Sequence, residues 1–325
     1  MPCRRRQVLL LIALAGAAAG ALFAALVAGE IPMGFADVAA ALSGAEHLQA
    51  TVIRELRLPR AIAAFACGGL LATAGALMQV LLRNPLADPY ILGISGGAAV
   101  AALGAITLGA ATFWVDASAF VGALTAMVVV FGLAHGDGSW TQTRLLLTGV
   151  IVAAGCGAAV SLMLALAPDT RVMSMLFWMM GDASAAARPW PAVVVLVLAL
   201  VVVMPFARDL NVLARGELTA RALGVRVGHL RIALYVLASL LTATSVTLVG
   251  SVGFVGLIVP HLVRLVLGND QRVLIPAAAL AGGTLLTLAD TAARTVMAPQ
   301  QLPVGVLTAL IGVPVFLFLL SRSKA

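Results

Sequence analysis

The sequence predicts an all-α, polytopic membrane protein with about ten transmembrane helices. Of its 325 residues, 62% are hydrophobic and 10% are charged, whereas a soluble domain has about 25% charged residues. The mean hydropathy is +1.10. Apolar runs long enough to cross a bilayer follow one another along the chain, and helices are the default in hydrocarbon because they pair every backbone polar group. We therefore expect a single transmembrane domain over residues 1–325.

Ten apolar runs are predicted to be the transmembrane helices, and most reach or approach the roughly 17–25 residues that a span needs. The runs lie at residues 8–28, 58–82, 91–111, 117–134, 144–167, 192–206, 229–249, 253–267, 273–290 and 304–320. Glycines within them, such as Gly68, Gly75 and Gly282, predict close helix–helix packing, because small residues let two backbones approach. The first run is longer than the apolar region of a signal peptide, about 7–15 residues, so we expect it to remain as a helix.

The cations predict the orientation of the chain. If the N-terminus is cytoplasmic and ten spans alternate, the outside loops hold only Arg54, Arg57, Arg60, Arg171, Arg188 and Arg294. The rest of the 20 Lys and Arg residues then lie inside, as the positive-inside rule requires. Both termini are therefore expected in the cytoplasm. The net charge of +7 reflects this topology rather than nucleic-acid binding, because no basic stripe is interleaved with aromatic residues.

Several enzyme classes are excluded by missing motifs. A Walker-A loop needs a lysine after its glycines, and the only lysine is the penultimate residue, Lys324. The histidines and cysteines lie too far apart to form a recognisable metal motif or disulfide framework. The stretch Gly93–Gly96 matches the GxSG of rhomboid-type intramembrane proteases, with His261 as a candidate base. Such a short match arises easily in a glycine-rich chain, so we interpret Ser95 as a serine near a helix N-terminus whose neighbouring glycines allow close packing, and we expect neither catalytic residues nor a metal site.

Two segments interrupt the apolar pattern, one in each half of the chain. In residues 83–97 (RNPLADPYILGISGG), Asn84-Pro85 ends a helix and Asp88 can cap the next span. In residues 250–264 (GSVGFVGLIVPHLVR), three glycines and Pro260 break the run. Non-helical backbone at membrane depth needs protein or a watery cavity around it, and paired broken segments are typical of a transport path. A plain interhelical turn is the alternative.

Charged residues predict two interaction surfaces. Arg54, Arg57 and Arg60 are expected to crowd the N-terminus of the second span, where the helix dipole costs each cation about 0.3–1 kcal/mol. An anionic partner outside explains this placement, and snorkelling to lipid headgroups is the alternative. Inside, residues 208–231 combine helical spacing of leucines with glycine breaks. Two short amphipathic helices are therefore predicted there, with an apolar face suited to a protein partner.

A set of motifs in these segments carries a resemblance to a known family. The motifs are RLPR (57–60), RNPLADPYILGISGGA (83–98), RLLLTGV (144–150), FWMMG (177–181), GELTARALGV (216–225), GFVGLIVPHLVR (253–264), LAD (288–290) and LPVG (302–305). They occur in family order over nearly the whole chain. The sequence thereby resembles the permease subunits of bacterial ABC importers for metal chelates, namely ferric siderophores, haem and vitamin B12.

The resemblance implies the type II ABC importer permease fold, with ten helices in two pseudo-symmetric halves. It implies a homodimer or pseudo-dimer around a central path, in contact with lipid of the bacterial inner membrane. Two separate ATP-binding subunits would hold ATP and magnesium, and a periplasmic binding protein would deliver the metal chelate. The chain itself is then expected to bind no cofactor and to catalyse no reaction.

The resemblance also assigns site residues by position. In members of the family, the arginines at the positions of Arg57, Arg60 and Arg294 contact acidic residues of the periplasmic binding protein. Coupling helices within about 208–231 seat on the ATPase, at positions matching Arg215, Gly216, Glu217, Ala220, Arg221, Leu223 and Gly224. Asn84 and Leu86 match one inner gate, and Gln142 and Thr143 match another.

The predicted function is ATP-driven import of an iron-siderophore, or a related chelate such as haem or vitamin B12, by alternating access. One alternative is an ion-coupled secondary transporter, which usually needs an ionisable residue buried in the membrane. Asp290, near the end of the ninth run, is the nearest candidate for such a residue. The other alternative is the intramembrane serine protease built on Ser95.

Overall fold

The chain folds into helices, and the part that the structure describes contains no strand. This computed structural model describes residues 2–29, 31, 33–45, 47–134, 141–184, 186 and 188–322, so Lys324 lies outside it. The helices at the predicted spans are α1 (Pro2–Val27), α4 (Leu58–Leu81), α5 (Ile94–Thr107), α6 (Thr112–Ala134), α7 (Gln142–Leu166), α9 (Trp190–Val203), α12 (Val227–Val249), α13 (Val255–Leu267), α14 (Gln271–Thr295) and α15 (Val304–Arg322). The all-α membrane architecture is thereby confirmed.

The described residues include seven helical stretches that are long and apolar enough to cross a membrane. The shorter apolar helices are α5, α13 and α15. Two of them are short because the broken segments delay their start. Gly93, with φ 73°, precedes α5, and Phe254, with φ 69°, precedes α13. Both residues hold the left-handed backbone conformation, which a regular helix cannot contain.

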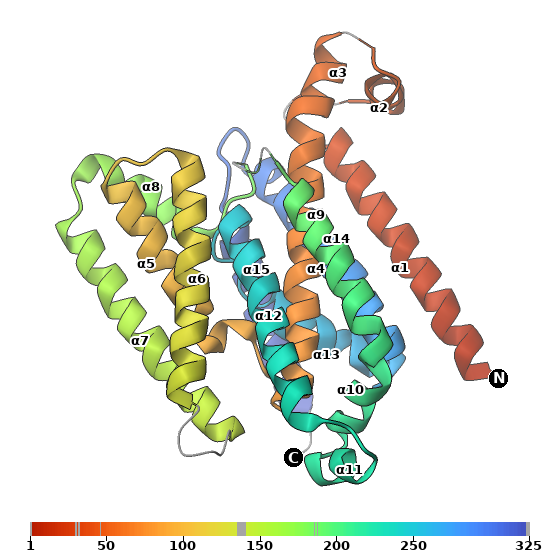
Figure 1. The fold of residues 1–325 in the computed structure, drawn as a ribbon. Coiled ribbons are helices and arrows are strands. Elements are labelled where there is room, and N and C mark those ends of the chain that lie inside the picture. The colour runs from red at the N-terminus through yellow and green to blue at the C-terminus, as the bar shows by residue number, and fades with distance from the viewer. Residues whose placement is uncertain are drawn as a thin grey trace.

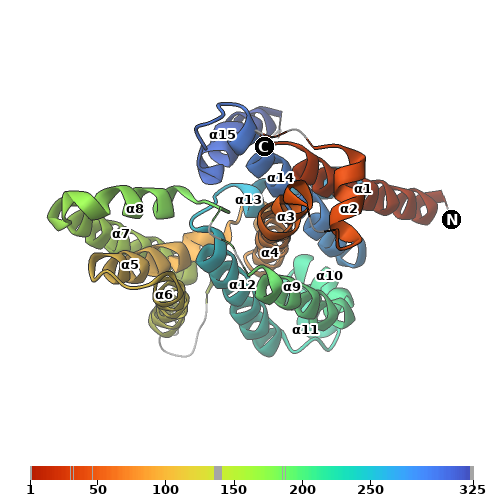
Figure 2. The same ribbon diagram turned by 90° about the horizontal axis from the view of Figure 1, so that it is seen from above.

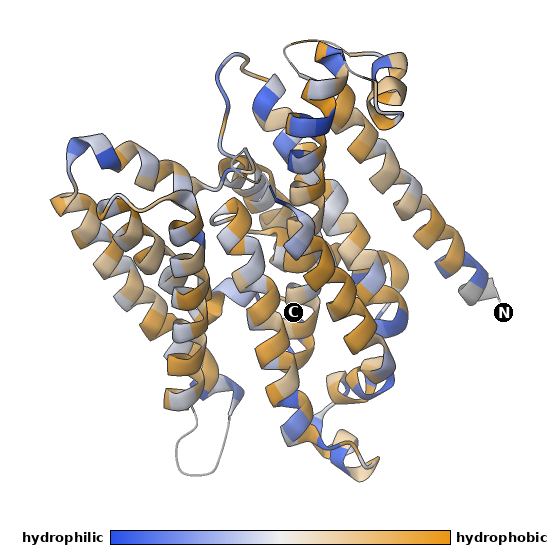
Figure 3. Cartoon of the chain, turned by 45° about the horizontal axis from the view of Figure 1, so that its top comes forward, coloured by the Kyte–Doolittle hydropathy of each residue, from blue (hydrophilic) through white to orange (hydrophobic). Residues whose placement is uncertain are grey.

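Shorter helical elements connect the long helices, and most of them lie at the two ends of the bundle (Figure 1). They are α2 (Phe35–Leu42), α3 (Leu48–Val52), the π-helical turn η1 (Ile53–Arg57), the 3₁₀ turns η2 (Pro89–Leu92) and η3 (Met204–Phe206), α8 (Asp169–Met180), α10 (Ala207–Ala214) and α11 (Glu217–Ala222). We call the two ends of the molecule the α3 end and the α11 end. Hydrophilic residues concentrate at these ends (Figure 3), and both chain termini lie toward the α11 end (Figure 1).

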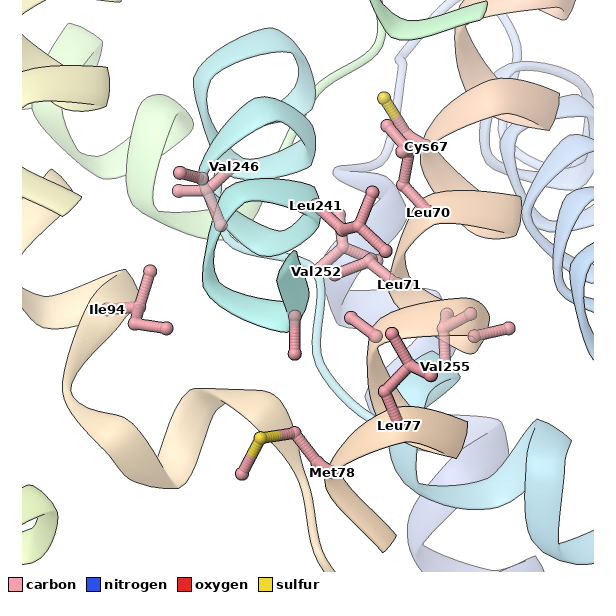
Figure 4. Close-up of a cluster of buried hydrophobic side chains, with 14 of the residues drawn as sticks. Cys67, Leu70, Leu71, Leu77, Met78, Ile94, Leu241, Val246, Val252 and Val255 are labelled. Carbon is pink, nitrogen blue, oxygen red and sulfur yellow. The ribbon is translucent and has the colours of Figure 1, made fainter. Parts of the chain in front are cut away.

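Helix α4 is the centre of the core. It belongs to the helical stretch Leu48–Leu81, in which 89% of the most apolar 18 residues are buried. The corresponding share for α7 is 11%. Leu71 and Leu77 of α4 lie beside side chains of α12 and α13 (Figure 4). Close packing of small residues is confirmed, because a Cβ at Gly75 would overlap the carbonyl oxygen of Gly256 in α13. The same holds for Gly68 against Gly282 of α14.

The chain has two halves, α4–α7 and α12–α15, and the first helix of each half packs against the third helix of the other. Helix α4 packs against α14, and its counterpart α12 packs against α6, the counterpart of α14. Within each half, the second helix contacts the third and fourth: α5 meets α6 and α7, and α13 meets α14 and α15. Viewed from above, α5–α8 form one group, and α12 lies where this group meets the rest (Figure 2). The pattern fits two pseudo-symmetric halves.

Two local predictions about the broken segments were wrong. Pro260 lies inside α13 without ending it, so the second break is confined to the residues around Gly250 and Phe254. Proline removes one helical hydrogen bond, and here the helix continues through that loss. Asp88 caps the short η2 rather than the next span: its Oδ1 accepts a hydrogen bond of 2.7 Å from the backbone N–H of Tyr90.

Candidate functional site

The predicted docking arginines form one cluster at the α3 end, and two of them bind the end of α1. Arg57 is buried and donates hydrogen bonds to the carbonyl oxygens of Leu26 (2.8 Å), Val27 (2.9 Å) and Ile31 (2.7 Å). Arg294, in the last turn of α14, donates to the carbonyl oxygen of Ala28 at 2.8 Å and to that of Ala25. Carbonyls at a helix C-terminus lack helical partners and carry partial negative charge. The two guanidinium groups therefore fasten α1 to α4 and α14.

The third arginine of the cluster, Arg60, is held by a carboxylate of this chain. Its Nε lies 2.9 Å from Oδ2 of Asp290, and its Nη2 lies 2.8 Å from Oδ1. Its Nη1 donates to Gln301 at 2.9 Å, and Asp182 lies at 3.9 Å. The Asp290 side chain is 3% exposed. Asp290 is therefore paired with Arg60. This ion pair explains why an ionisable residue lies buried there, without the ion-coupling role that a secondary transporter would give it.

The expected crowding at a helix N-terminus is wrong. The helical stretch that contains α4 begins at Leu48, and η1 connects α3 to α4 without a break. Arg54 and Arg57 therefore lie within a continuous helical segment, away from a free positive end. Arg54 is exposed, unlike Arg57. Part of the negative charge expected from a partner outside is supplied within the chain, by Asp290 and by the carbonyls of α1.

The predicted pair of short amphipathic helices is confirmed at the α11 end. Helices α10 and α11 meet at Gly216, whose φ of 132° is accessible mainly to glycine. Leu213 of α10 and Ala220 of α11 are buried, whereas Leu218 and Leu223 are 85% and 66% exposed. Two large apolar side chains on so short a helix leave an uncovered apolar surface. We call residues 207–224 the α10–α11 hairpin.

The α10–α11 hairpin is tied to α12 by ion pairs. Glu217 contacts Arg221 at 2.7 Å and Arg231 of α12 at 2.6 Å. Partial burial of Glu217 raises its pKa, but the hydrogen bonds and charges of Arg221 and Arg231 lower it, and the net pKa lies below its ordinary value of 4.5. The carboxylate is therefore ionised at neutral pH and positions α11 against the start of α12.

A second contact ties the hairpin to α14. Asn211 of α10 donates from Nδ2 to Oδ1 of Asp270 at 2.8 Å and accepts from the backbone N–H of Gln271 at 2.8 Å. Asp270 is the N-cap of α14, whose other end carries Asp290 and Arg294. Helix α14 thus joins the hairpin at one end of the molecule to the arginine cluster at the other.

The predicted gate residues lie near the α11 end of α4, where Gln142 contacts Leu81 and Arg83. Oδ1 of Asn84 accepts from the backbone N–H of Leu86 at 2.9 Å and shapes the bend after α4. Gln142, the first residue of α7, donates to the carbonyl oxygen of Leu81 at 2.9 Å. Thr143, its neighbour, is exposed. The structure therefore brings the start of α7 to the bend, which the sequence could not show because 59 residues separate Gln142 from Arg83.

The two broken segments meet each other near the middle of the molecule. The hydroxyl groups of Ser95 and Ser251 lie 3.1 Å apart, and the backbone N–H of Val252 donates to the hydroxyl of Tyr90 at 3.1 Å. Ser95 is therefore bonded to another hydroxyl group, a poor base. A groove of about 510 Å³ begins beside this contact and is lined by Met179, Met180, Ser251, Gly305, Val306 and Pro314. Its walls belong to α8, the second broken segment and α15.

The described residues contain no group of three or more His, Cys, Asp or Glu side chains placed to hold a metal ion. The arrangement they do contain is that of a transport protein: apolar helices, paired broken segments and polar clusters at both ends. The class defined by this fold and these sites is a multi-pass membrane permease. Residues 10–322 match the FecCD transport family, and the chain belongs to that family.

Individual relatives agree with this assignment. A cobalamin import system permease of Halobacterium salinarum is 41% identical over 303 residues, covering 91% of this chain and 81% of the relative. A hemin transport system permease of Yersinia pestis is 40% identical, with 83% of each chain covered. A solved structure of an inward-facing metal-chelate type ABC transporter has a TM-score of 0.85 and 29% identity, covering 97% of this chain and 99% of the other. These findings favour the permease over the secondary transporter and the protease.

Proposed function

We propose that this chain is the permease subunit of an ATP-driven importer that moves a metal chelate from the periplasm to the cytoplasm. The observation that carries the proposal is the α10–α11 hairpin, which exposes Leu218 and Leu223 while Glu217 and Asn211 fix it to two long helices. Such a surface suits a partner that pushes on the helix bundle. Similarity to two chelate permeases and to a metal-chelate type transporter supports the same function.

The energy for transport comes from the proposed partner. Two ATP-binding subunits seat on the hairpins of two permease copies, and ATP and magnesium bind to those subunits. This chain then binds no cofactor and catalyses no reaction. A second copy of the chain closes the open side of the groove beside Ser251, so that the chelate passes between the two copies. Met179 and Met180 present flexible apolar side chains to that path.

The two ends of the molecule suggest how the chain is oriented in the membrane. The α11 end, with both termini, is placed in the cytoplasm, and the α3 end faces the periplasm of a bacterial inner membrane. Arg57, Arg60 and Arg294 then form the docking site for a periplasmic binding protein. Asn84, Leu86, Gln142 and Thr143 form the inner gate at the bend. Docking outside and ATP-driven motion inside act on opposite ends of α14.

The chelate itself is chosen by the binding protein, and a ferric siderophore is the proposed substrate. Haem and cobalamin, the cargoes named for the two relatives, are the competing candidates. Uptake assays with each of the three labelled chelates, in a strain lacking other importers, distinguish them. Uptake of haem or cobalamin but not of the ferric siderophore contradicts the proposed substrate and leaves the permease function intact.

The attachment of the ATPase is tested by replacing one exposed leucine at each end. Leu218→Asp puts a charge on the proposed contact, and we expect the ATP-binding subunit to be lost on co-purification. Leu48→Asp makes the same change at the α3 end, where the leucine is 73% exposed, and attachment should be unaffected. Retention of the ATPase by Leu218→Asp, or equal loss in both variants, would contradict the proposed role of the hairpin.

A further inference from the structure

A hollow at the α11 end lies between the bend after α4 and the α10–α11 hairpin. Its volume is about 640 Å³, and its walls include Arg83, Arg215, Glu217, Leu218, Thr219 and Arg221. Arg83 is the only one of these that comes from the bend, and the others belong to the hairpin. The hollow therefore joins the proposed ATPase surface to the proposed gate.

The charge of the hollow is positive. Glu217 is already paired with Arg221 and Arg231. Neither Arg83 nor Arg215 forms an ion pair within the part of the chain that the structure describes, and both are exposed. An entering carboxylate would find two guanidinium groups without a carboxylate partner. Guanidinium–carboxylate hydrogen bonds are about twice as strong as neutral ones.

Arg83 also contacts the gate. Its φ is 46°, an unusual conformation for a residue with a side chain, and it directs the chain out of α4 into the bend. Its Nη2 donates to Oε1 of Gln142 at 3.2 Å, while Nε2 of Gln142 donates to the carbonyl oxygen of Leu81 at 2.9 Å. One side chain thus reaches both the hollow and the first residue of α7. The amide of Gln142 is neutral, so a carboxylate would compete with it for Arg83.

We propose that an acidic side chain of the ATP-binding subunit enters this hollow, binds Arg83 and draws it away from Gln142. Nucleotide-driven movement then reaches the inner gate directly through Arg83, in addition to the route through the hairpin. Loss of the Arg83–Gln142 bond frees the start of α7 from the end of α4. The proposal rests on the proposed function, because it requires an ATP-binding subunit on the hairpin.

Proximity is tested by photo-crosslinking in the assembled complex. The amino acid p-benzoyl-phenylalanine replaces Arg83, Arg144 or Leu218 in three separate variants. Arg144 is a matched control, because it is exposed on the first turn of α7 and does not line the hollow. We expect crosslinks to the ATP-binding subunit from positions 83 and 218 but not from 144. Crosslinks from 218 without 83 overturn the inference alone, whereas no crosslink from any position contradicts the proposed function.

Coupling is tested by uptake per ATP hydrolysed in proteoliposomes with all subunits. Arg83→Gln is expected to lower this ratio about tenfold or more, as for loss of one hydrogen bond to a charged group. Arg83→Lys, which keeps the charge, should restore most of it. Arg144→Gln removes an equivalent charge outside the hollow and should leave the ratio unchanged. An unaltered ratio in Arg83→Gln, or an equal fall in Arg144→Gln, overturns the inference.

Discussion

Arg60 of α4 and Asp290 of α14 form a bidentate ion pair across 230 residues of sequence, at the end of the molecule opposite the hairpin. Both side chains are largely removed from solvent, with 13% and 3% exposure. Such a pair contributes little relative to a well-packed apolar pair, but removal of one member leaves the other charge uncompensated. The pair therefore fixes the relative position of the two helices that carry the proposed docking arginines.

Asp290→Asn tests the structural side of this pair. The substitution keeps the shape of the side chain but removes the buried carboxylate that binds Arg60, leaving only Asp182 at 3.9 Å, so we expect a loss of about 3 kcal/mol in stability. Thermal unfolding in detergent measures the change. Asp169→Asn is the matched control, because Asp169 is exposed in α8 and makes no ion pair in the described part of the chain. Equal unfolding temperatures for Asp290→Asn and the unmodified protein would show that the pair does not hold α4 to α14.

The docking role of Arg60 is a separate prediction. Arg60→Gln should weaken binding of the periplasmic binding protein about thirtyfold or more, because truncating one partner of a buried interfacial charge pair costs about 2–5 kcal/mol. Surface plasmon resonance on permease in nanodiscs measures the affinity, and the difference should shrink at high salt. Arg171→Gln changes an exposed arginine of α8 in the same way and should bind normally. Unchanged affinity in Arg60→Gln argues against docking at this cluster.

Arg57→Lys separates the shape of the guanidinium from its charge. A lysine ammonium group cannot reproduce the planar fork that reaches the carbonyls of Leu26, Val27 and Ile31. We expect about 1–3 kcal/mol of stability to be lost as the end of α1 is released. Arg54→Lys, at an exposed position nearby, should leave the unfolding temperature unchanged. Normal stability of Arg57→Lys would mean that these contacts do not anchor α1.

Glu217 gives the hairpin a defined pH dependence. Because its pKa is below the ordinary value in the folded protein, its stabilising contribution is complete above about pH 4.5 and is lost as the pH falls through the folded pKa. The unmodified protein should therefore be more stable than Glu217→Gln by a constant amount at about pH 6–8, and this advantage should vanish in stronger acid. Thermal unfolding of both proteins, from about pH 8 down into the acid range below about pH 4.5, measures this difference in stability. An advantage that grows as the pH falls would contradict the ion pairs with Arg221 and Arg231.

Gly75→Ala tests the close approach of α4 and α13. A methyl group at Gly75 would overlap the backbone of Gly256, and overpacking of a tight core costs about 1–3 kcal/mol. Gly20→Ala is the control, since a Cβ at Gly20 in α1 meets nothing within 4 Å. We expect a lower unfolding temperature for Gly75→Ala only. Tolerance of Gly75→Ala would show that the helices can separate at this point without loss.

Much of this fold could be read from the sequence because a membrane imposes a simple pattern. Every long apolar run became a helix, and the pair of short amphipathic helices followed from leucine spacing interrupted by glycine. The helix boundaries were harder to predict. Phe254 adopts a left-handed conformation that no local rule assigns to phenylalanine, and Pro260 continues a helix that its residue type argues against.

The polar contacts of the site were mostly beyond the sequence. Arg60 and Asp290 each stood out singly, as a misplaced cation and a buried acid, but their pairing depends on how α4 packs on α14. The carbonyl partners of Arg57 carry no sequence signal, because every residue has a carbonyl. Arg83 lies inside a recognised motif, yet its contact with Gln142 appears only when the bend meets α7.

The central claim is that this chain transports only with a nucleotide-binding partner, and reconstitution tests it most directly. The chain is placed in liposomes alone, with the ATP-binding subunit, or with both that subunit and the binding protein, and accumulation of a labelled metal chelate is followed. We predict uphill transport only in the complete system and only with hydrolysable ATP. Uphill accumulation by the chain alone, driven by a proton or sodium gradient, would contradict the account.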